Sequence, residues 1–211
     1  MENEQLNTIK TWLGSGSVNL FGLPFAGKDT VGIKLAEIFG GRFLSSGMIL
    51  REHERENKEI RVLDKGFLVP SNDFREIVLP YLASQELVGL PLFLSSFGRW
   101  DGEQFDVLAA LDDSQHVLKA VILLNVSENE IKNRWETAKN LNDRGEEERV
   151  DDRKLEVLET RISEFTKKTM PVVEFYKDQG VLIPVNAHQS REAVVMETLK
   201  KLYAFAMGHP L

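Results

Sequence analysis

A glycine-rich segment near the start of the chain limits most strongly what it can fold into. Residues 22–30 read Gly-Leu-Pro-Phe-Ala-Gly-Lys-Asp-Thr, with the spacing G-x-x-x-x-G-K. This spacing is typical of a loop that wraps phosphates, because glycines let backbone N–H groups approach the oxygens and the lysine adds a mobile positive charge. Residues 18–21 are apolar and residues 30–39 are amphipathic, so we expect a buried strand, the loop and then a helix whose positive dipole end faces the phosphates. An ordinary Gly/Pro turn would not need these flanking segments.

The segment departs from the usual motif directly after its lysine. The hydroxyl residue expected next to Lys28 is replaced by Asp29, and Thr30 comes one place later. Asp29 and Thr30 are therefore the candidates for the surroundings of a metal ion, although no direct protein ligand is assured. The residues expected to bind the donor phosphates are Gly22, Pro24, Ala26, Gly27, Lys28, Asp29 and Thr30.

Composition narrows the class of protein. The chain has 211 residues, of which 42% are hydrophobic, and this suits one domain with a substantial core. It has no cysteine and a formal net charge of −7, which argues against disulfides, Cys-based zinc sites and a broadly basic nucleic-acid surface. The N-terminus does not resemble a signal peptide and no apolar run approaches the length of a membrane span. We expect a cytoplasmic monomer without nucleic-acid or membrane partners, in which the four histidines are solvated surface residues.

Apolar segments alternate with helical patterns along the chain, which favours a parallel sheet covered on both faces. The helical segment that precedes Pro171 should bury Leu155, Leu158, Ile162 and Phe165 on one face. Ser127 and Glu130 have the spacing of a capping box. The expected strands are residues 18–21, 42–44, 90–94, 119–126 and 181–185. The expected helices are about 4–13, 30–39, 46–56, 78–87, 153–168, 171–180 and 191–206, with another after Ser127.

Six segments, in order along the chain, resemble the motifs of one enzyme family. The phosphate loop resembles G-x-P-x-x-G-K-G-T, which accounts for the late threonine. The other five resemble S-T-G-D-x-L-R (residues 44–51), G-x-L-V-P (66–70), D-G-F-P-R after a strand (93–99), R-x-D-D (149–152) and T-x-P-x-x-x-x-Y (169–176). The chain therefore resembles a nucleoside monophosphate kinase of the adenylate kinase family over nearly its whole length.

This resemblance implies reversible transfer of the γ-phosphoryl group of ATP to a nucleoside monophosphate, with AMP the first choice and Mg²⁺ accompanying ATP. By resemblance, Lys28, Arg99, Arg149 and Arg161 are catalytic, and Arg134 covers the base of ATP. The acceptor nucleotide is assigned to Ser46, Gly47, Arg51, Val69, Arg99 and Gln104. Arginine suits phosphate because its planar fork binds two oxygens. The alternatives are that Arg51 and Arg134 are solvated helix residues and that Arg161 is a partner of acids on its own helix.

The implied fold is α/β, a P-loop NTPase-type parallel sheet of about five strands with helices on both faces. Residues 1–211 form a single kinase domain, with its core at about 15–45 and 88–211. A small helical acceptor-binding insert at about 46–87 and a short lid at about 135–150 are expected to move. The lid has no cysteine and is too short for the zinc-bearing type.

Two acidic positions of the family are lost here. Met48 occupies the position of the aspartate in S-T-G-D, and Ser95 occupies the position of the aspartate in D-G-F-P-R. The acceptor-base position is Glu103, with Gln104 one residue further on. Two alternatives therefore stay open: a P-loop kinase for another monophosphate or small metabolite, and a catalytically impaired nucleotide-binding regulatory module.

Overall fold

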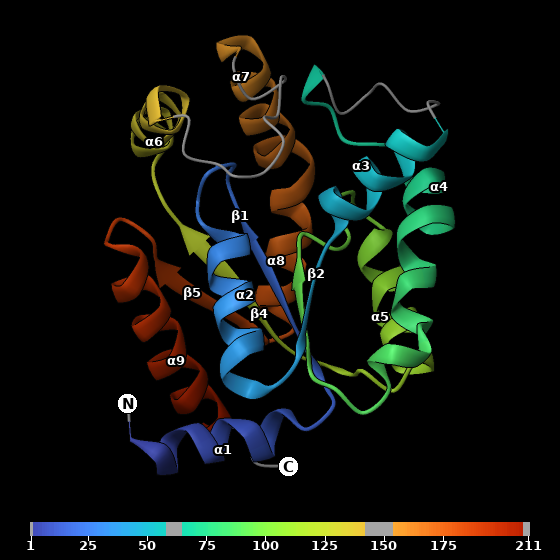
Figure 1. The fold of residues 1–211 in the computed structure, drawn as a ribbon, viewed down its shortest axis with the longest axis vertical. Helices are drawn as coiled ribbons and strands as arrows, with labels where there is room; N and C mark the ends of the chain where they lie inside the picture. Colours follow the sequence, from blue (N-terminus) through green and yellow to red (C-terminus); the bar gives the residue numbers. More distant parts are fainter. Residues whose placement is uncertain (1, 58–64, 142–153, 209–211) are drawn as a thin grey trace.

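Five parallel strands form the centre of the molecule, in the order β2-β3-β1-β4-β5. The computed structural model describes residues 2–57, 65–141 and 154–208, and Figure 1 shows their arrangement. The parallel sheet of five strands expected from the sequence is confirmed. The strands are β1 (Ser17–Gly22), β2 (Arg42–Ser45), β3 (Leu92–Ser95), β4 (Leu118–Asn125) and β5 (Leu182–Asn186).

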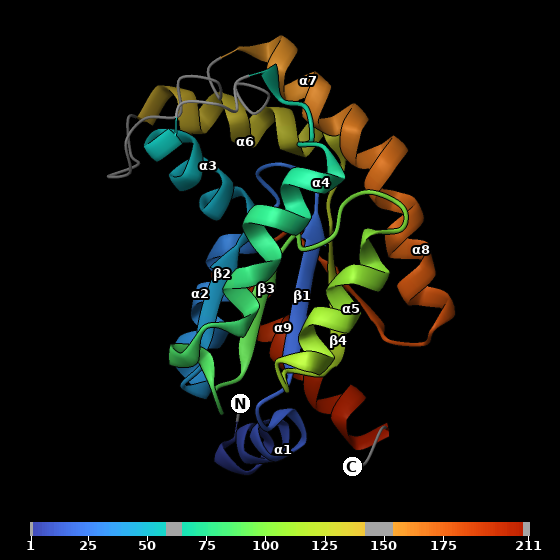
Figure 2. The same cartoon turned by 90° about the vertical axis from the view of Figure 1, so that its right-hand side faces the viewer.

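Helices cover both faces of this sheet (Figures 1 and 2). Successive side chains of a strand point to opposite faces. Val18 and Leu20 of β1 accordingly join the cluster under the first set of helices, whereas Phe21 packs with the second set. Burial on both faces explains why the central strands read as continuous apolar runs. The first set is α1 (Asn3–Leu13), α2 (Lys28–Phe39) and α9 (Arg191–Gly208), and the second is α5 (Glu103–Asp113) and α8 (Met170–Asp178).

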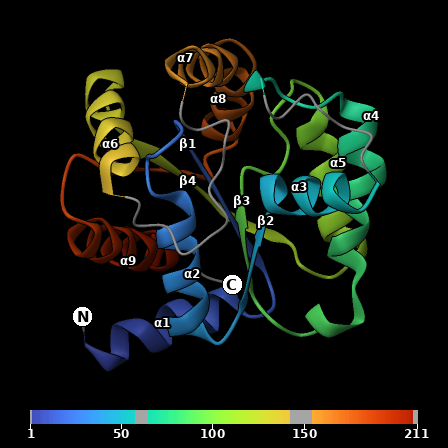
Figure 3. The ribbon, with the colours of Figure 1, turned by 45° about the horizontal axis from the view of Figure 1, so that its top comes forward.

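Three helices surround the carboxyl ends of the strands (Figure 3). They are α3 (Ser46–Asn57), α6 (Glu128–Leu141) and α7 (Leu155–Glu164). The chain leaves β1 for β2 and β3 on one side, and reaches β4 and β5 on the other. Open α/β sheets bind ligands at the carboxyl ends of their strands where the order reverses in this way. None of the described helices is both long and apolar enough to cross a membrane.

Two helical runs accommodate a proline directly after a wide π turn. One run consists of α4 (Ser71–Asp73), a π turn (Phe74–Val78) and two 3₁₀ turns (Leu79–Ala83 and Gln85–Leu87). The predicted start of the helix at about 78–87 was therefore wrong, because the helical run begins at Ser71. The second π turn (Phe165–Thr169) joins α7 to α8, in which Pro171 is the second residue. Proline cannot donate the usual helical hydrogen bond, and a change of helical pitch before it avoids that defect.

Two local expectations were also wrong. Leu155 is exposed, and Val157 instead packs in the core beside Leu158 and Ile162. His116 is buried, with its Nδ1 atom 2.8 Å from the carbonyl oxygen of Ser15. His116, which lies between α5 (Glu103–Asp113) and β4, thus contacts the connection between α1 and β1 through Ser15. Most of the expected lid lies outside the described residues.

A buried amide connects the middle of β1 to the segment that follows β3. Asn19 is completely buried, its Nδ2 donates to the carbonyl of Phe97 at 2.8 Å, and its Oδ1 accepts from the Phe97 N–H at 3.3 Å. Both backbone polar groups of Phe97 are satisfied by this one side chain. The segment that leads to Arg99 is therefore held from inside the sheet.

We predict that Asn19→Ala lowers the free energy of unfolding by about 2 kcal/mol, because it leaves the buried N–H and C=O of Phe97 without partners. Urea denaturation followed by circular dichroism measures this change. Asn7→Ala, on the exposed face of α1, is the matched control and should stay within about 0.5 kcal/mol of the parent. Equal midpoints for the two variants would contradict the role given to Asn19.

Candidate active site

A cleft of about 790 Å³ lies at the carboxyl ends of the strands. The phosphate loop, the first turn of α3, the segment after β3, α6, α7 and the start of α9 all contribute to its walls. Thirteen of the residues expected from the sequence line it together. They are Gly22, Pro24, Ala26, Gly27, Lys28, Asp29, Thr30, Ser46, Gly47, Arg51, Arg99, Arg134 and Arg161.

Positive charge dominates this cleft in an otherwise acidic protein. Among the described lining residues, the cations are Lys28, Arg51, Arg99, Arg134, Arg161 and Arg191, and the anions are Asp29 and Glu130. The chain as a whole carries a formal net charge of −7. Concentrating cations in a concave site while the rest of the surface is acidic favours a small, multiply charged anion as ligand.

The phosphate loop turns into α2 at Gly27. Its φ of +93° lies in the left-handed region, which glycine adopts without steric cost, and α2 begins at the next residue. The Nζ of Lys28 folds back over the loop and donates to the carbonyls of Gly22 and Leu23, both at 2.9 Å. The loop therefore presents a helix N-terminus and an ammonium group at one point.

Serine side chains tie the acceptor side of the cleft to the end of β3. Ser45 pairs with Ser95 in the register of β2 and β3, which brings the start of α3 beside the segment after β3. The Oγ of Ser46 donates to the carbonyls of Ser96 at 2.8 Å and of Ser95 at 3.3 Å. Gly47 and Arg51 then follow on α3 and line the same wall.

Arg99 is a buried cation of the cleft whose pKa is lowered. Desolvation, followed by the positive charge of Arg161, lowers the pKa of Arg99 to about 10, whereas Glu103 and Glu164 act in the opposite direction. Arg99 thus stays protonated at neutral pH. Its Nε is buried and has no hydrogen-bond partner within the described part of the chain. Two neighbouring arginines, one of them with an unsatisfied buried donor, favour the arrival of an anion.

The backbone around Arg99 is fixed by a carboxylate. The Oε2 of Glu103 accepts from the N–H of Arg99 at 2.7 Å and from that of Trp100 at 3.0 Å. Ser96, in the same segment, has a φ of +59°, and Phe25 in the phosphate loop has a φ of +60°. Positive φ is uncommon in residues other than glycine and tends to occur at functional sites.

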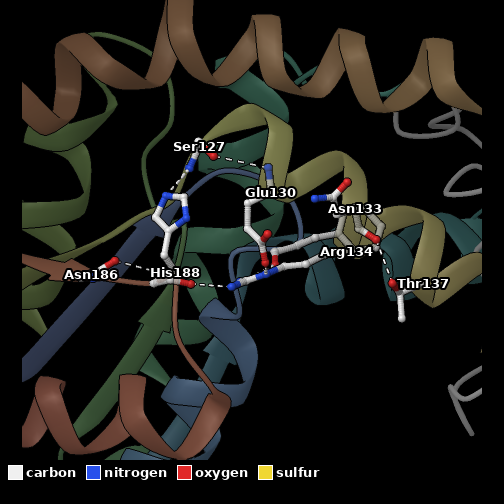
Figure 4. Close-up of polar contacts among 9 residues, drawn as sticks. Ser127, Glu130, Asn133, Arg134, Thr137, Asn186 and His188 are labelled. Carbon is white, nitrogen blue, oxygen red and sulfur yellow. Dashed lines mark hydrogen bonds and ion pairs between the residues drawn. The ribbon is translucent and has the colours of Figure 1, made fainter.

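Arg134 lies on α6 and connects three parts of the cleft wall (Figure 4). It donates to the Oε1 of Glu130 at 2.9 Å, to the carbonyl of Ala187 at 2.5 Å and to that of Phe25 at 3.5 Å. The hydrogen bond from Arg134 holds the pKa of Glu130 below its usual range. Figure 4 also shows the N–H of Ser127 donating to His188, which joins α6 to the segment after β5.

The structure places two expected site residues elsewhere. Val69 and Gln104 are buried and do not line this cleft. Arg149 lies outside the described residues.

Sequence reasoning also missed several lining residues. Asn133 and Thr137 stand on α6 at helical spacing from Arg134 and Glu130. Gln189, Ser190 and Arg191 lie where the segment after β5 enters α9, at the carboxyl edge of the sheet. That location after the last strand was the signal available for the second group.

Asp29 meets Ser95 across the cleft. The Oγ of Ser95 donates to the Oδ1 of Asp29 at 2.7 Å. Residues 2–57, 65–141 and 154–208 hold no cluster of three or more His, Asp or Glu side chains arranged for a metal ion. Mg²⁺ in kinases keeps several waters and is held through one or two carboxylates together with the substrate phosphates. Asp29 and Thr30, beside the phosphate loop, fit that limited role.

Comparison with solved structures identifies the fold. A gluconokinase from Sinorhizobium meliloti 1021 superposes with a TM-score of 0.62 over 92% of this chain and 95% of its own. The two sequences are 18% identical, so this likeness concerns the fold.

Comparison with known sequences identifies the family. The adenylate kinase of Methanosarcina mazei is 27% identical over 213 aligned residues, covering 89% of this chain and 98% of its own length. That of Oenococcus oeni is 30% identical, covering 89% and 97%, and that of Thermus thermophilus is 31% identical, covering 79% and 86%. The family model for adenylate kinase matches residues 20–181. The chain therefore belongs to the adenylate kinase family.

Proposed function

We propose that this protein transfers the γ-phosphoryl group of ATP reversibly to a nucleoside monophosphate, with AMP as the first acceptor to test. The observation that carries the proposal is the desolvated Arg99, set beside Arg161 in the same cleft as the phosphate loop. Phosphoryl transfer asks a protein mainly for in-line positioning and for positive charge around the moving group. A site that only bound a nucleotide would not need a second, buried arginine there.

In this proposal the cleft has a donor end and an acceptor end. The phosphate loop with Lys28 binds the phosphates of ATP, and Arg134 holds the wall beside its base. Ser46, Gly47 and Arg51 bind the acceptor phosphate, at the wall that Ser46 ties to the end of β3. Arg99, Arg161 and Arg149 surround the phosphoryl group that moves between the two ends.

Mg²⁺ accompanies ATP, and Asp29 and Thr30 are the residues proposed to face its water shell. When bound, the ion offsets charge on the phosphate oxygens. Asp29 stands where other phosphate loops have a metal-binding hydroxyl residue, and its hydrogen bond from Ser95 orients the carboxylate. In the family the carboxylate belongs to the position of Ser95, so the acid has moved from β3 to α2.

The first test replaces the phosphate-loop lysine. Lys28→Met removes the charge and keeps most of the length, and we predict a loss of about 10²- to 10³-fold in kcat, as for other groups that stabilise transition-state charge. A coupled assay with ATP and AMP measures this. Lys34→Met, an exposed lysine on the same helix, is the control and should keep normal turnover. Near-normal turnover in Lys28→Met would refute the kinase assignment.

The second test concerns magnesium. Asp29→Gly restores the residue found in the family, yet we predict that it raises the Mg²⁺ concentration needed for half-maximal rate, because a carboxylate near the water shell is lost. Ser95→Asp should lower that concentration. Calorimetric titration of ATP with and without Mg²⁺ gives a second readout, in which Asp29→Gly should lose the contribution of the ion to affinity. Unchanged titrations in Asp29→Gly would remove Asp29 from the metal's surroundings.

The third test concerns closure of the acceptor-binding insert and the lid. Kinases exclude water during transfer, commonly by moving such segments. Hydrogen exchange should slow in residues 46–57 and 65–87, and in the lid sequence 135–150, when a bisubstrate analogue that joins two adenosines through phosphates binds. Peptides from α1 serve as the internal control. Unchanged exchange in the insert and the lid would contradict closure.

A further inference from the structure

The residues expected to recognise the acceptor base form a closed network of their own. Glu103 and Gln104 are each 2% exposed, and Val69 is 5% exposed. A base can be recognised through hydrogen bonds only by polar atoms that it can reach and that are not already paired. The pairing of these three residues therefore decides how the acceptor is read.

The polar atoms of Glu103 and the carbonyl of Val69 are bound to other parts of the protein. The carbonyl of Val69 accepts from the indole Nε1 of Trp100 at 2.9 Å. The Oε1 of Glu103 accepts from the Oγ of Ser71 at 2.7 Å, while its Oε2 accepts from the N–H groups of Arg99 and Trp100. Glu103 thus braces the segment before α5.

Gln104 is paired in the same way. Its Oε1 accepts from the N–H of Gly102 at 2.7 Å, and its Nε2 donates to Asp101 at 3.2 Å. Both ends of the amide are used within the turn that starts α5. The family's way of reading a base at this position is therefore replaced by local structure.

Trp100 is held firmly over Val69. The Nζ of Lys168 lies 4.0 Å from the centroid of a Trp100 ring, a cation–π contact. Lys168 is in turn paired with Glu164 at 2.6 Å, and Glu164 also accepts from the N–H of Leu68 at 3.1 Å. The indole, the turn at Leu68-Val69 and the helical run of α7 are thus connected.

Gly66 brings that turn against α7. Its φ is +81°, and a Cβ there would lie 2.7 Å from the carbonyl of Val157 and 3.0 Å from the Cγ of Arg161. Only glycine allows this approach. The contact holds the start of this turn close to α7.

The phosphate end of the acceptor site has the opposite character. Ser46, Gly47, Arg51 and Arg99 line the cleft, and the Nε of Arg99 is buried without a partner in the described ranges. Beside them, Phe67 lines the cleft and is 46% exposed. An aromatic face stacks on any base and distinguishes them poorly.

We infer that the acceptor site recognises the phosphate and reads the base only through shape and stacking, so that monophosphates of several bases are substrates. This inference rests on the proposed transfer to a nucleoside monophosphate. Pockets without hydrogen bonds to the distinguishing group discriminate by about 10- to 200-fold, whereas sites that hydrogen-bond it discriminate by about 10⁴- to 10⁵-fold.

The experiment measures kcat/KM for AMP, GMP, CMP and UMP at saturating ATP and Mg²⁺, and the Kd of each monophosphate by calorimetry. We expect a spread within about 200-fold in both quantities. Trp100→Phe removes the indole N–H and frees the Val69 carbonyl for an exocyclic amine. It should raise the preference for AMP and CMP over UMP by about tenfold. Trp12→Phe, on the buried face of α1, is the matched control and should keep the parent ratios.

The outcomes separate this inference from the proposed function. A spread larger than about 200-fold among phosphorylated acceptors, or unchanged ratios in Trp100→Phe, overturns the inference and leaves the kinase function standing. Binding of all four monophosphates within the same range without any transfer overturns the proposed function and the claim that they are substrates, and supports only the part of the inference that concerns recognition of the base. Absence of binding by all four overturns both.

Discussion

The buried guanidinium of Arg99 is the charge on which the arrangement of the cleft depends. Removing a cation from water is costly, and the lowered pKa of Arg99 reflects that cost together with repulsion from Arg161. The negative charges of Glu103 and Glu164 offset the desolvation and the repulsion only in part. An arriving phosphate would therefore meet a positive electrostatic field that is already in place. Such preorganised charge stabilises a transition state without further reorganisation. The surrounding hydrogen bonds keep Arg99 in this unfavourable position.

Those hydrogen bonds come from three directions. Asn19 holds Phe97 from within the sheet, Glu103 holds the N–H of Arg99 itself from α5, and Ser46 holds the carbonyl of Ser96 from α3. Each bond ties the short segment after β3 to a different element. The position of Arg99 is consequently set by the whole sheet edge, which suits the role proposed for it beside the phosphoryl group that moves.

Two changes of side chain give this member of the family its own character. A carboxylate at the end of β3 is replaced by Ser95, whose hydroxyl now donates to Asp29 on the neighbouring helix. Glu103 stands at the position that the resemblance assigns to the acceptor base, and its carboxylate is hydrogen-bonded inside the protein. Under the proposed function, both cases exchange a polar group between substrate recognition and internal support, while the residues proposed to bind phosphate are kept.

The sequence by itself determined the fold class, the phosphate loop and thirteen of the residues that line the cleft, because strand–loop–helix patterns and motif spacing are local properties of the chain. It also determined the capping of α6 by Ser127, whose Oγ accepts from the N–H of Glu130 at 3.3 Å. Only the tertiary structure decided what the polar residues bind. Asn19 reads as part of an apolar strand, yet it is paired with the backbone of Phe97, which is distant in the sequence. Gln104 reads as a ligand for a base, yet its Oε1 accepts from the backbone N–H of the nearby Gly102. Such pairings depend on which segments the parallel sheet brings together, and this information is not present in any single stretch of sequence.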